Sequence, residues 1–168
     1  MQDRPVDERA WIALGANLGD REAALDGAVR ELASAPDVRV LRVSPWIETD
    51  PVGGPVGQGR YLNGVLEARV AVGARALLDL LQRIEGEFGR DRSREVRNGP
   101  RTLDLDLLLY GTARLREPGL VVPHPRLEER RFVLEPLVAL EPDLVLPSGR
   151  TARGALANLP APARIGMR

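Results

Sequence analysis

Apolar residues recur along the chain with two spacings, one typical of strands and the other typical of helices. Short apolar or alternating runs, such as "RAWIALGA" and "TLDLDLLLYG", predict strands. Two longer segments carry apolar residues three and four positions apart and predict helices, and Asp20 is placed to cap the first of them. The expected strands cover 9–16, 38–49, 61–72 and 102–111, and the expected helices cover 21–35 and 74–88. This β-α-β-β-α-β order predicts an α+β ferredoxin-like sandwich, with an antiparallel sheet and two helices on one face.

Two loops and a C-terminal extension complete the expected core. The segment 50–60 is rich in Pro and Gly, and the segment 89–101 is polar and dense in Arg, as in functional loops. Residues 121–140 predict a loop and a helical segment, and residues 143–159 predict a short strand or turn and a small helix. With 168 residues and neither repeat nor linker, we expect one domain, 1–168, with a core of about 10–147 and a small C-terminal segment, 148–168.

Composition and charge exclude several classes of function. The chain has 24 basic and 24 acidic residues, whereas a general nucleic-acid binder would usually show a basic excess. There is no Lys and no Cys, which excludes a lysine nucleophile, a P-loop lysine, disulfides and zinc–thiolate sites. The N-terminal segment lacks an apolar signal core, and no stretch approaches the ~18 apolar residues of a membrane span. We therefore expect a cytoplasmic, soluble protein that binds neither nucleic acid nor a membrane.

Two aspartates lie inside the last expected strand, where unpaired carboxylates are costly to bury. Because side chains alternate faces along a strand, Asp104 and Asp106 point to one side, opposite Leu103, Leu105 and Leu107. An edge strand with a solvated acidic face is the simpler interpretation. The functional interpretation is a Mg²⁺ site, since Mg²⁺ is usually held by one or two carboxylates together with substrate phosphates.

The loop before this strand favours the functional interpretation. Its five arginines are Arg90, Arg92, Arg94, Arg97 and Arg101. They could form a salt-bridge lattice with the aspartates, or clamp a triphosphate, because Arg binds phosphate oxygens in a bidentate fork. An acidic pair beside an Arg-rich loop suits phosphoryl transfer, although neither a P-loop nor a kinase Gly-rich loop is present. The lone histidine, His124, lies between two prolines and is either structural or, with Arg126, Arg130 and Arg131 following it, a phosphate contact.

Six segments of the chain match a known family in order and spacing. The segment "RNGPRTLDLDLL", which contains both aspartates, is the most specific. The others are "IALGANLGD", "ETDPVGGP", "YLNGVL", "RIEGEFGRDR" and "VPHPRLEERRFVLEPL". Together they extend from about Trp11 to Pro147 and resemble the 6-hydroxymethyl-7,8-dihydropterin pyrophosphokinase family of folate biosynthesis.

The resemblance implies a ferredoxin-like fold and one reaction. Pyrophosphate would pass from ATP, the co-substrate, to the hydroxymethyl group of 6-hydroxymethyl-7,8-dihydropterin, with release of AMP. Asp104 and Asp106 would hold two Mg²⁺ ions that bridge the ATP phosphates. Arg90, Arg92 and Arg101 match the family's catalytic arginines. The family is mostly monomeric, which implies a monomer.

The resemblance also implies two substrate sites. The positions that match the family's ATP site are Gln82, Glu85, Arg92, Arg101, His124 and Arg130. The positions that match its pterin site are Thr49, Asp50, Pro51, Val52, Tyr61, Asn63, Asp104 and Phe132. Two aromatic rings suit a flat heterocycle, and an Asn that can donate and accept suits its amide-like edge.

Three positions depart from the family pattern, and two other functions stay open. Asn98 stands where the family often has Trp, and Pro125 stands where some members have Tyr. Gly119 stands where some members have an Arg on the nucleotide side, and the nearby Arg116 could replace that Arg. One alternative is another two-metal nucleotidyl or phosphoryl transferase, against which the neutral charge argues. The other is a non-catalytic nucleotide-binding ferredoxin-like module, against which the aspartates and the Arg loop argue together.

Overall fold

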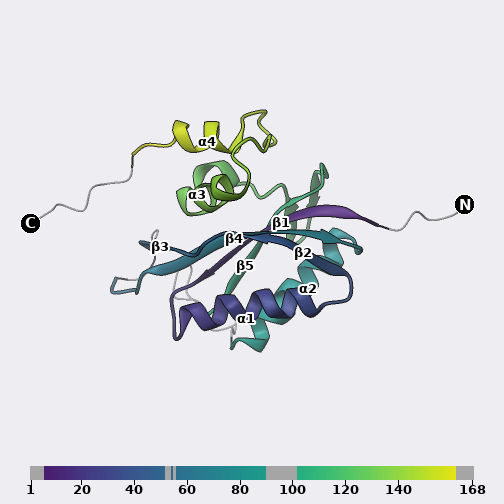
Figure 1. Cartoon of the computed structure of the whole chain (residues 1–168), viewed down its shortest axis with the longest axis horizontal. Coiled ribbons are helices and arrows are strands. Elements are labelled where there is room, and N and C mark those ends of the chain that lie inside the picture. The colour runs from purple at the N-terminus through teal and green to yellow at the C-terminus, as the bar shows by residue number, and fades with distance from the viewer. Residues whose placement is uncertain (1–5, 52–53, 55, 90–101, 162–168) are drawn as a thin grey trace, which may run out of the picture.

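The sheet expected from the sequence forms the middle layer of the molecule (Figure 1). The computed structural model describes residues 6–51, 54, 56–89 and 102–161. The strands of this sheet are β1 (Glu8–Ala16), β2 (Val38–Val43), β3 (Ile47–Thr49), β4 (Tyr61–Val70) and β5 (Asp104–Tyr110). Their order is β2-β4-β1-β5, with β3 also paired to β4, and every pair is antiparallel. This confirms the predicted ferredoxin-like α+β fold.

Helices α1 (Arg21–Ser34) and α2 (Ala74–Glu87) cover one face of the sheet, as predicted (Figure 1). Helix α1 begins where the sequence indicates, because the Asp20 carboxylate accepts a hydrogen bond from the Ala23 N–H at 3.0 Å. The apolar side chains of both helices pack against alternate residues of the strands, among them Leu14, Leu66 and Leu105. These residues form the larger of the two apolar cores.

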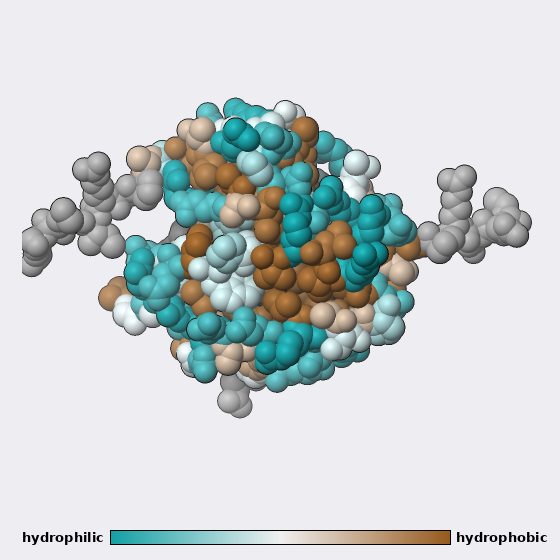
Figure 2. Space-filling model, in the orientation of Figure 1, coloured by the Kyte–Doolittle hydropathy of each residue, from teal (hydrophilic) through white to brown (hydrophobic). Residues whose placement is uncertain are grey.

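Helices α3 (Arg131–Leu140) and α4 (Ala152–Asn158) lie on the opposite face of the sheet (Figure 1). They enclose a second core with sheet residues that include Trp11, Val65 and Leu108. In the space-filling view, apolar residues are visible in the middle of the molecule, between more hydrophilic surfaces above and below (Figure 2). None of the helices in the described ranges has both the length and the apolar character to cross a bilayer.

The prediction of a single strand over 38–49 is wrong, because this segment forms two separate strands, β2 and β3. Pro45 has no N–H to contribute to a ladder. At the break, the Ser44 hydroxyl takes the place of a backbone acceptor and receives the Val65 N–H at 2.9 Å. The next residue after the proline, Trp46, turns its indole N–H to the Asp26 carboxylate of α1 at 3.0 Å. The break lets β3 pair with the far end of β4.

A hairpin that the sequence pattern did not reveal follows β5. It consists of β6 (Leu115–Glu117) and β7 (Leu120–Val122), and a 3-10 turn, η2 (Leu127–Glu129), precedes α3. The two-residue connection is Pro118-Gly119, and Gly119 has a φ of +73°, which residues with a side chain rarely adopt. The turn therefore gives a structural reason for the glycine at this position.

A buried carboxylate connects α3 to the sheet. Glu67 of β4 is 2% exposed and forms ion pairs with Arg9 at 2.5 Å and with Arg42 at 3.1 Å. Arg42 also donates to the Leu140 carbonyl, at the end of α3, at 2.6 Å, and pairs with Glu141 just beyond it. The hydrogen bonds to Glu67 and Glu141 raise the pKa of Arg42, so it stays charged. We call Glu67, Arg9, Arg42 and Glu141 the Glu67 clasp.

Replacing the buried carboxylate should destabilise the fold. In Glu67→Gln, two arginines lose their shared anion, and we expect the free energy of unfolding to fall by about 3 kcal/mol, the lower end for a broken buried pair because both arginines are partly exposed. Urea unfolding would measure the change. The matched control is Glu48→Gln, whose exposed pairs with Arg21 and Arg60 should matter little. Equal losses in the two variants would contradict a stabilising role for the clasp.

Candidate active site

The register of the sheet places polar residues in rows on the α3 face. Directly opposed residues of antiparallel strands point to the same face. The row of Ala13 contains Val65 and Asp106, and the next row contains Gly15, with Asn63 on one side and Asp104 on the other. Helices α3 and α4 cover the apolar residues of this face, such as Trp11 and Val65. We call the polar part of this face, from Asp104 and Asp106 across Gly15 to Asn63, Tyr61 and Thr49, the open strip. Its two ends are partly exposed, whereas Gly15 and Asn63 in its middle are buried.

The aspartates lie at the β5 end of the open strip. Both are partly exposed, while Leu105 between them is buried in the opposite core, as the alternation predicts. Arg130, at the start of α3, approaches Asp106 with a distance of 3.7 Å between Nη1 and Oδ2. In the described ranges, no three His, Cys, Asp or Glu side chains gather around a common point. Such a pair of hard oxygen donors suits Mg²⁺ that receives its other ligands from phosphates and water.

The N-terminal end of α3 places Arg130 and Phe132 beside the aspartates. The Arg130 guanidinium carbon lies 5.5 Å from the centre of the Phe132 ring, a cation–π contact. Phe132 is partly buried against the second core. The predicted nucleotide residue Arg130 and the predicted pterin residue Phe132 therefore lie next to each other.

His124 lies between the aspartates and the β6–β7 hairpin. Its backbone N–H donates to the Leu108 carbonyl at 2.9 Å, and its Nδ1 accepts the Arg126 N–H at 3.1 Å. Burial lowers the pKa of His124 to about 4, with Arg130 contributing in the same direction and Asp104 opposing it. A neutral ring whose Nδ1 accepts must carry its proton on Nε2, so His124 is a hydrogen-bond donor at neutral pH.

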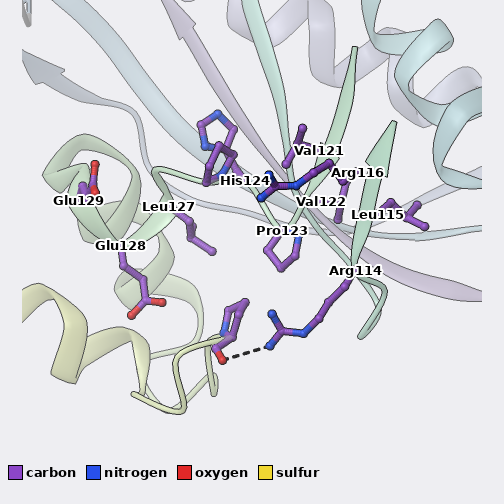
Figure 3. A pocket seen from close by; sticks show the side chains of 12 residues that line it. Arg114, Leu115, Arg116, Val121, Val122, Pro123, His124, Leu127, Glu128 and Glu129 are labelled. Atoms are coloured by element: carbon purple, nitrogen blue, oxygen red, sulfur yellow. Dashed lines mark hydrogen bonds between the residues drawn. The ribbon is translucent and has the colours of Figure 1, made fainter. Parts of the chain in front are cut away.

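A cavity of about 410 Å³ adjoins His124 (Figure 3). The hairpin lines one side with Leu115, Arg116 and Val121, and the turn η2 contributes to another. Arg114 lies across the cavity from His124 and donates to the Pro147 carbonyl at 3.3 Å (Figure 3). Arg116, which the sequence suggested as a substitute for the arginine missing at Gly119, thus lines the same cavity as His124.

The other end of the open strip is formed by β3 and β4. Thr49 is opposite Tyr61 and diagonal to Asn63, and its hydroxyl donates to Asn63 Oδ1. Asn63 is 7% exposed, and Thr49 and Tyr61 are partly exposed. The structure thus brings three predicted pterin residues together, with Asn63 in the same row of the sheet as Asp104.

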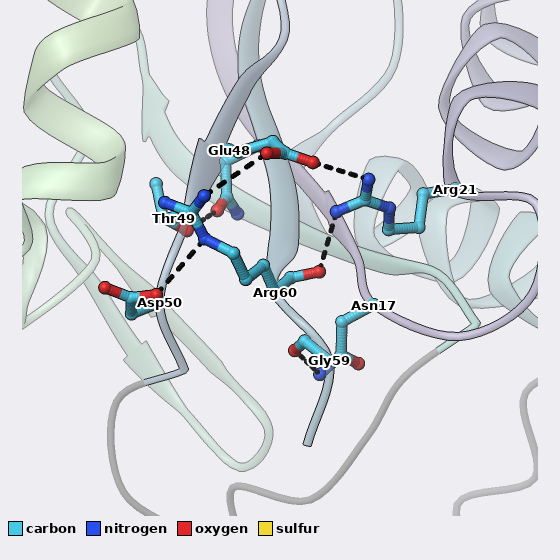
Figure 4. Close-up of polar contacts among 8 residues, drawn as sticks. Asn17, Arg21, Glu48, Thr49, Asp50, Gly59 and Arg60 are labelled. Atoms are coloured by element: carbon cyan, nitrogen blue, oxygen red, sulfur yellow. Dashed lines mark hydrogen bonds and ion pairs between the residues drawn. The ribbon is translucent and has the colours of Figure 1, made fainter. Parts of the chain in front are cut away.

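A ladder of ion pairs supports this end from outside (Figure 4). Glu48 pairs with Arg21 of α1 at 2.7 Å and with Arg60 at 3.3 Å, and Arg60 also pairs with Asp50 at 3.2 Å. Hydrogen bonding to Arg21 lowers the pKa of Glu48. Asp50, a predicted pterin residue, has its carboxylate engaged by Arg60, and Pro51 follows it with partial exposure.

The remaining predicted residues lie elsewhere. Glu85 is 1% exposed behind β5, and its carboxylate accepts the Leu105 N–H at 3.0 Å, so it supports the strand that carries the aspartates. Gln82 is exposed on α2. Their predicted ATP contacts stay predictions. The other predicted site residues, which lie outside the described residues, are Val52, Arg90, Arg92 and Arg101.

Sequence reasoning missed two parts of the site. Gly15 is the centre of the open strip, but a glycine near the end of an apolar strand gives no sign of which side chains lie beside it. Arg114 lines the cavity by way of a hairpin that the hydrophobic pattern did not reveal. The segment "IALGANLGD" contains Gly15 and was the one available signal.

The arrangement can bind an anionic ligand at one end and a planar polar ligand at the other. Asp104 and Asp106 offer oxygens for a cation, while Arg130 and the Nε2–H of His124 offer donors for phosphate oxygens. Asn63, Tyr61 and Thr49 offer an amide, a ring and a hydroxyl about two strand spacings away, ~10 Å. A reacting group held between the two ends would lie over Gly15.

Comparison with known proteins identifies the family. The model of 7,8-dihydro-6-hydroxymethylpterin-pyrophosphokinase (HPPK) matches residues 11–142. A 2-amino-4-hydroxy-6-hydroxymethyldihydropteridine pyrophosphokinase of Pseudomonas aeruginosa is 44% identical over 153 residues, which are 91% of this chain and 93% of the relative. Its counterpart from Bacillus subtilis is 48% identical over 131 residues, 78% of this chain and 77% of the relative.

The fold of solved structures agrees with this assignment. The crystal structure of Plasmodium falciparum HPPK-DHPS with pteroate superposes with a TM-score of 0.68 and 13% identity, over 94% of this chain. This chain spans 43% of the length of that larger protein. The fold, the family model and the curated relatives agree, and the chain belongs to the HPPK family.

Proposed function

We propose that the open strip carries out the pyrophosphoryl transfer of this family. The family assignment makes the chain a pterin pyrophosphokinase of folate biosynthesis. The hydroxymethyl oxygen of 6-hydroxymethyl-7,8-dihydropterin attacks the β-phosphorus of ATP, and its proton is released. An oxygen–phosphorus bond forms, the bond from the β-phosphorus to the α–β bridging oxygen breaks, and AMP leaves. The main support for this proposal is the register of the sheet, in which Asp104 and Asn63 lie on either side of Gly15 in one row.

The β5 end would hold the phosphates. Asp104 and Asp106 are the residues that would bind two Mg²⁺ ions, because they provide hard oxygen donors on one face and are accessible. Bound Mg²⁺ would supply charge neutralisation to the phosphate oxygens. Arg130 would contribute a further positive charge 3.7 Å from Asp106. Arg90, Arg92 and Arg101 are proposed from the sequence as the arginines that stabilise the transferred group.

The cavity beside His124 would receive the nucleoside end of ATP. It opens next to His124 and Arg130, and it combines apolar lining such as Leu115 and Val121 with the charge of Arg116 (Figure 3). The Nε2–H of the neutral His124 ring would donate to a ribose or phosphate oxygen. Positioning the nucleoside here would place its phosphates toward the aspartates.

The β3–β4 end would hold the pterin. Asn63 and Thr49 are hydrogen-bonded to each other and suit the amide-like edge of the heterocycle. Tyr61 and Phe132 would stack on its faces. Asp50, Pro51 and Val52 would border it from the adjoining loop.

The remaining features of the proposal concern the whole chain. We infer one domain acting as a monomer, as the resemblance to this family implies. The substrates would be ATP and the pterin alone, both water-soluble, in the cytoplasm.

Both aspartates should be essential for turnover. In Asp104→Asn and Asp106→Asn the charge that holds the cation is lost while the side-chain shape is kept, so AMP formation should fall at least ~100-fold at saturating ATP and pterin. Omitting Mg²⁺ from the wild-type reaction should have a similar effect. The matched control is Asp143→Asn, an exposed aspartate paired with Arg153. Near wild-type turnover in either site variant would refute the metal assignment.

His124 should make the fold less stable in acid. Its folded pKa, about 4, is below the ordinary value of 6.5, so the unfolded chain binds more protons between these pH values. The free energy of unfolding is therefore highest, as far as His124 is concerned, above about pH 6.5, and it falls as the pH drops toward 4. His124→Asn keeps an acceptor near Nδ1 but does not titrate, so its urea-unfolding free energy should depend less on pH in this window. Because His124 is the only histidine, parallel curves for both proteins would contradict the lowered pKa.

A further inference from the structure

Gly15 occupies a place where a side chain would collide with Asn63. A Cβ at this position would lie 2.7 Å from Asn63 Nδ2, 3.6 Å from Tyr61 Cδ1 and 3.8 Å from the Leu62 carbonyl oxygen. Gly15 belongs to a regular strand, paired with Asn63 on one side and Asp104 on the other, and its φ is not in the left-handed region. The backbone therefore does not require a glycine here, and glycine inside a strand is unfavourable in itself.

The Asn63 amide is held in one orientation. Its Oδ1 accepts the Thr49 hydroxyl, which leaves Nδ2 over Gly15, on the side of Asp104. Asn63 is 7% exposed, and in the part of the chain that the structure describes Nδ2 has no hydrogen-bond partner. Thr102 Oγ1 is the one fully buried side-chain polar atom without a partner among the described residues, so Nδ2 keeps some access to the open strip, and its N–H can meet an acceptor that a ligand brings.

We propose that Gly15 is a positioning residue for substrate recognition, which makes room for the Asn63 amide so that Nδ2 meets an acceptor on the pterin. The proposal rests on the proposed function for the identity of that ligand. The strip between Asn63 and Asp104 is about two strand spacings wide, ~10 Å, which fits a bicyclic heterocycle with its hydroxymethyl arm toward the aspartate. A methyl group at position 15 displaces the amide and misaligns its N–H. Among the neighbours of this methyl group only Asn63 Nδ2 is closer than ordinary van der Waals contact, so an effect transmitted by the amide should disappear when Asn63 is removed, whereas a direct collision with the pterin should persist.

A double-mutant cycle tests this transmission. The proteins are the wild type, Gly15→Ala, Asn63→Ala and the double variant, each measured for Kd of the pterin substrate and of a nonhydrolysable ATP analogue. Gly15→Ala and Asn63→Ala should each weaken pterin binding about 10-fold or more, the loss expected for a buried hydrogen bond. The ATP analogue should bind within about twofold of the wild type, because Gly15 acts on the pterin end. The double variant should bind the pterin no more weakly than Asn63→Ala alone.

The thermal stability of the same four proteins gives a second readout that needs no ligand. If a methyl group at position 15 collides with the amide, Gly15→Ala should lower Tm in the wild-type background. In the Asn63→Ala background, where the amide is gone, the same change should not lower Tm and should raise it slightly, because alanine suits a strand better than glycine. This comparison remains informative even if Gly15→Ala is too unstable for binding measurements. The matched control is Gly86→Ala, on the exposed side of α2 with open space around it, which should neither weaken pterin binding nor lower Tm.

Two outcomes would overturn the proposal. One is an unchanged pterin Kd in Gly15→Ala, and the other is a loss of affinity or Tm that is the same with and without Asn63. A wild-type protein that does not bind the pterin at all would instead refute the proposed function, while the Tm cycle would still report whether Gly15 and Asn63 are coupled.

Discussion

The Glu67 clasp determines how much of the second sheet face is left open. It fixes the end of α3 to β4, through Arg42 and the carbonyl of Leu140. Helix α3 has ten residues, a length of about 15 Å, and its start lies beside Asp106. The helix therefore lies over the apolar rows of the sheet, and its N-terminal end is at the edge of the polar row. Together with the apolar side chains that α3 buries in the second core, this attachment holds Arg130 and Phe132 at the site.

The strands of the proposed site pack one side against the core and turn the other side toward the open strip. In β5, Leu105 and Leu107 are buried against α1 and α2, while Asp104 and Asp106 face the open strip. Glu85 reinforces this arrangement, because its buried carboxylate satisfies the Leu105 N–H on the outer edge of β5. The two carboxylates that the sequence places inside an apolar run are thus tolerated because their side of the strand is left uncovered.

The sequence predicted best what depends on local periodicity. Strands β1, β4 and β5 and helices α1 and α2 have strong apolar patterns, and the shared face of Asp104 and Asp106 follows from alternation alone. The break between β2 and β3 was missed because Pro45 interrupts a pattern that otherwise alternates, and the hairpin after β5 has strands of only three residues. The contact between Gly15 and Asn63 depends on the register of β1 against β4, which no local pattern specifies.

If the open strip works as proposed, it joins a pterin to two phosphates of ATP in a single transfer. The most direct measurement is phosphorus NMR of the wild-type protein mixed with ATP, Mg²⁺ and 6-hydroxymethyl-7,8-dihydropterin. We expect AMP and a pterin ester with two coupled phosphorus signals to appear in equal amounts, with no ADP. Formation of ADP, or of AMP with free pyrophosphate while the pterin is not consumed, would contradict this proposal.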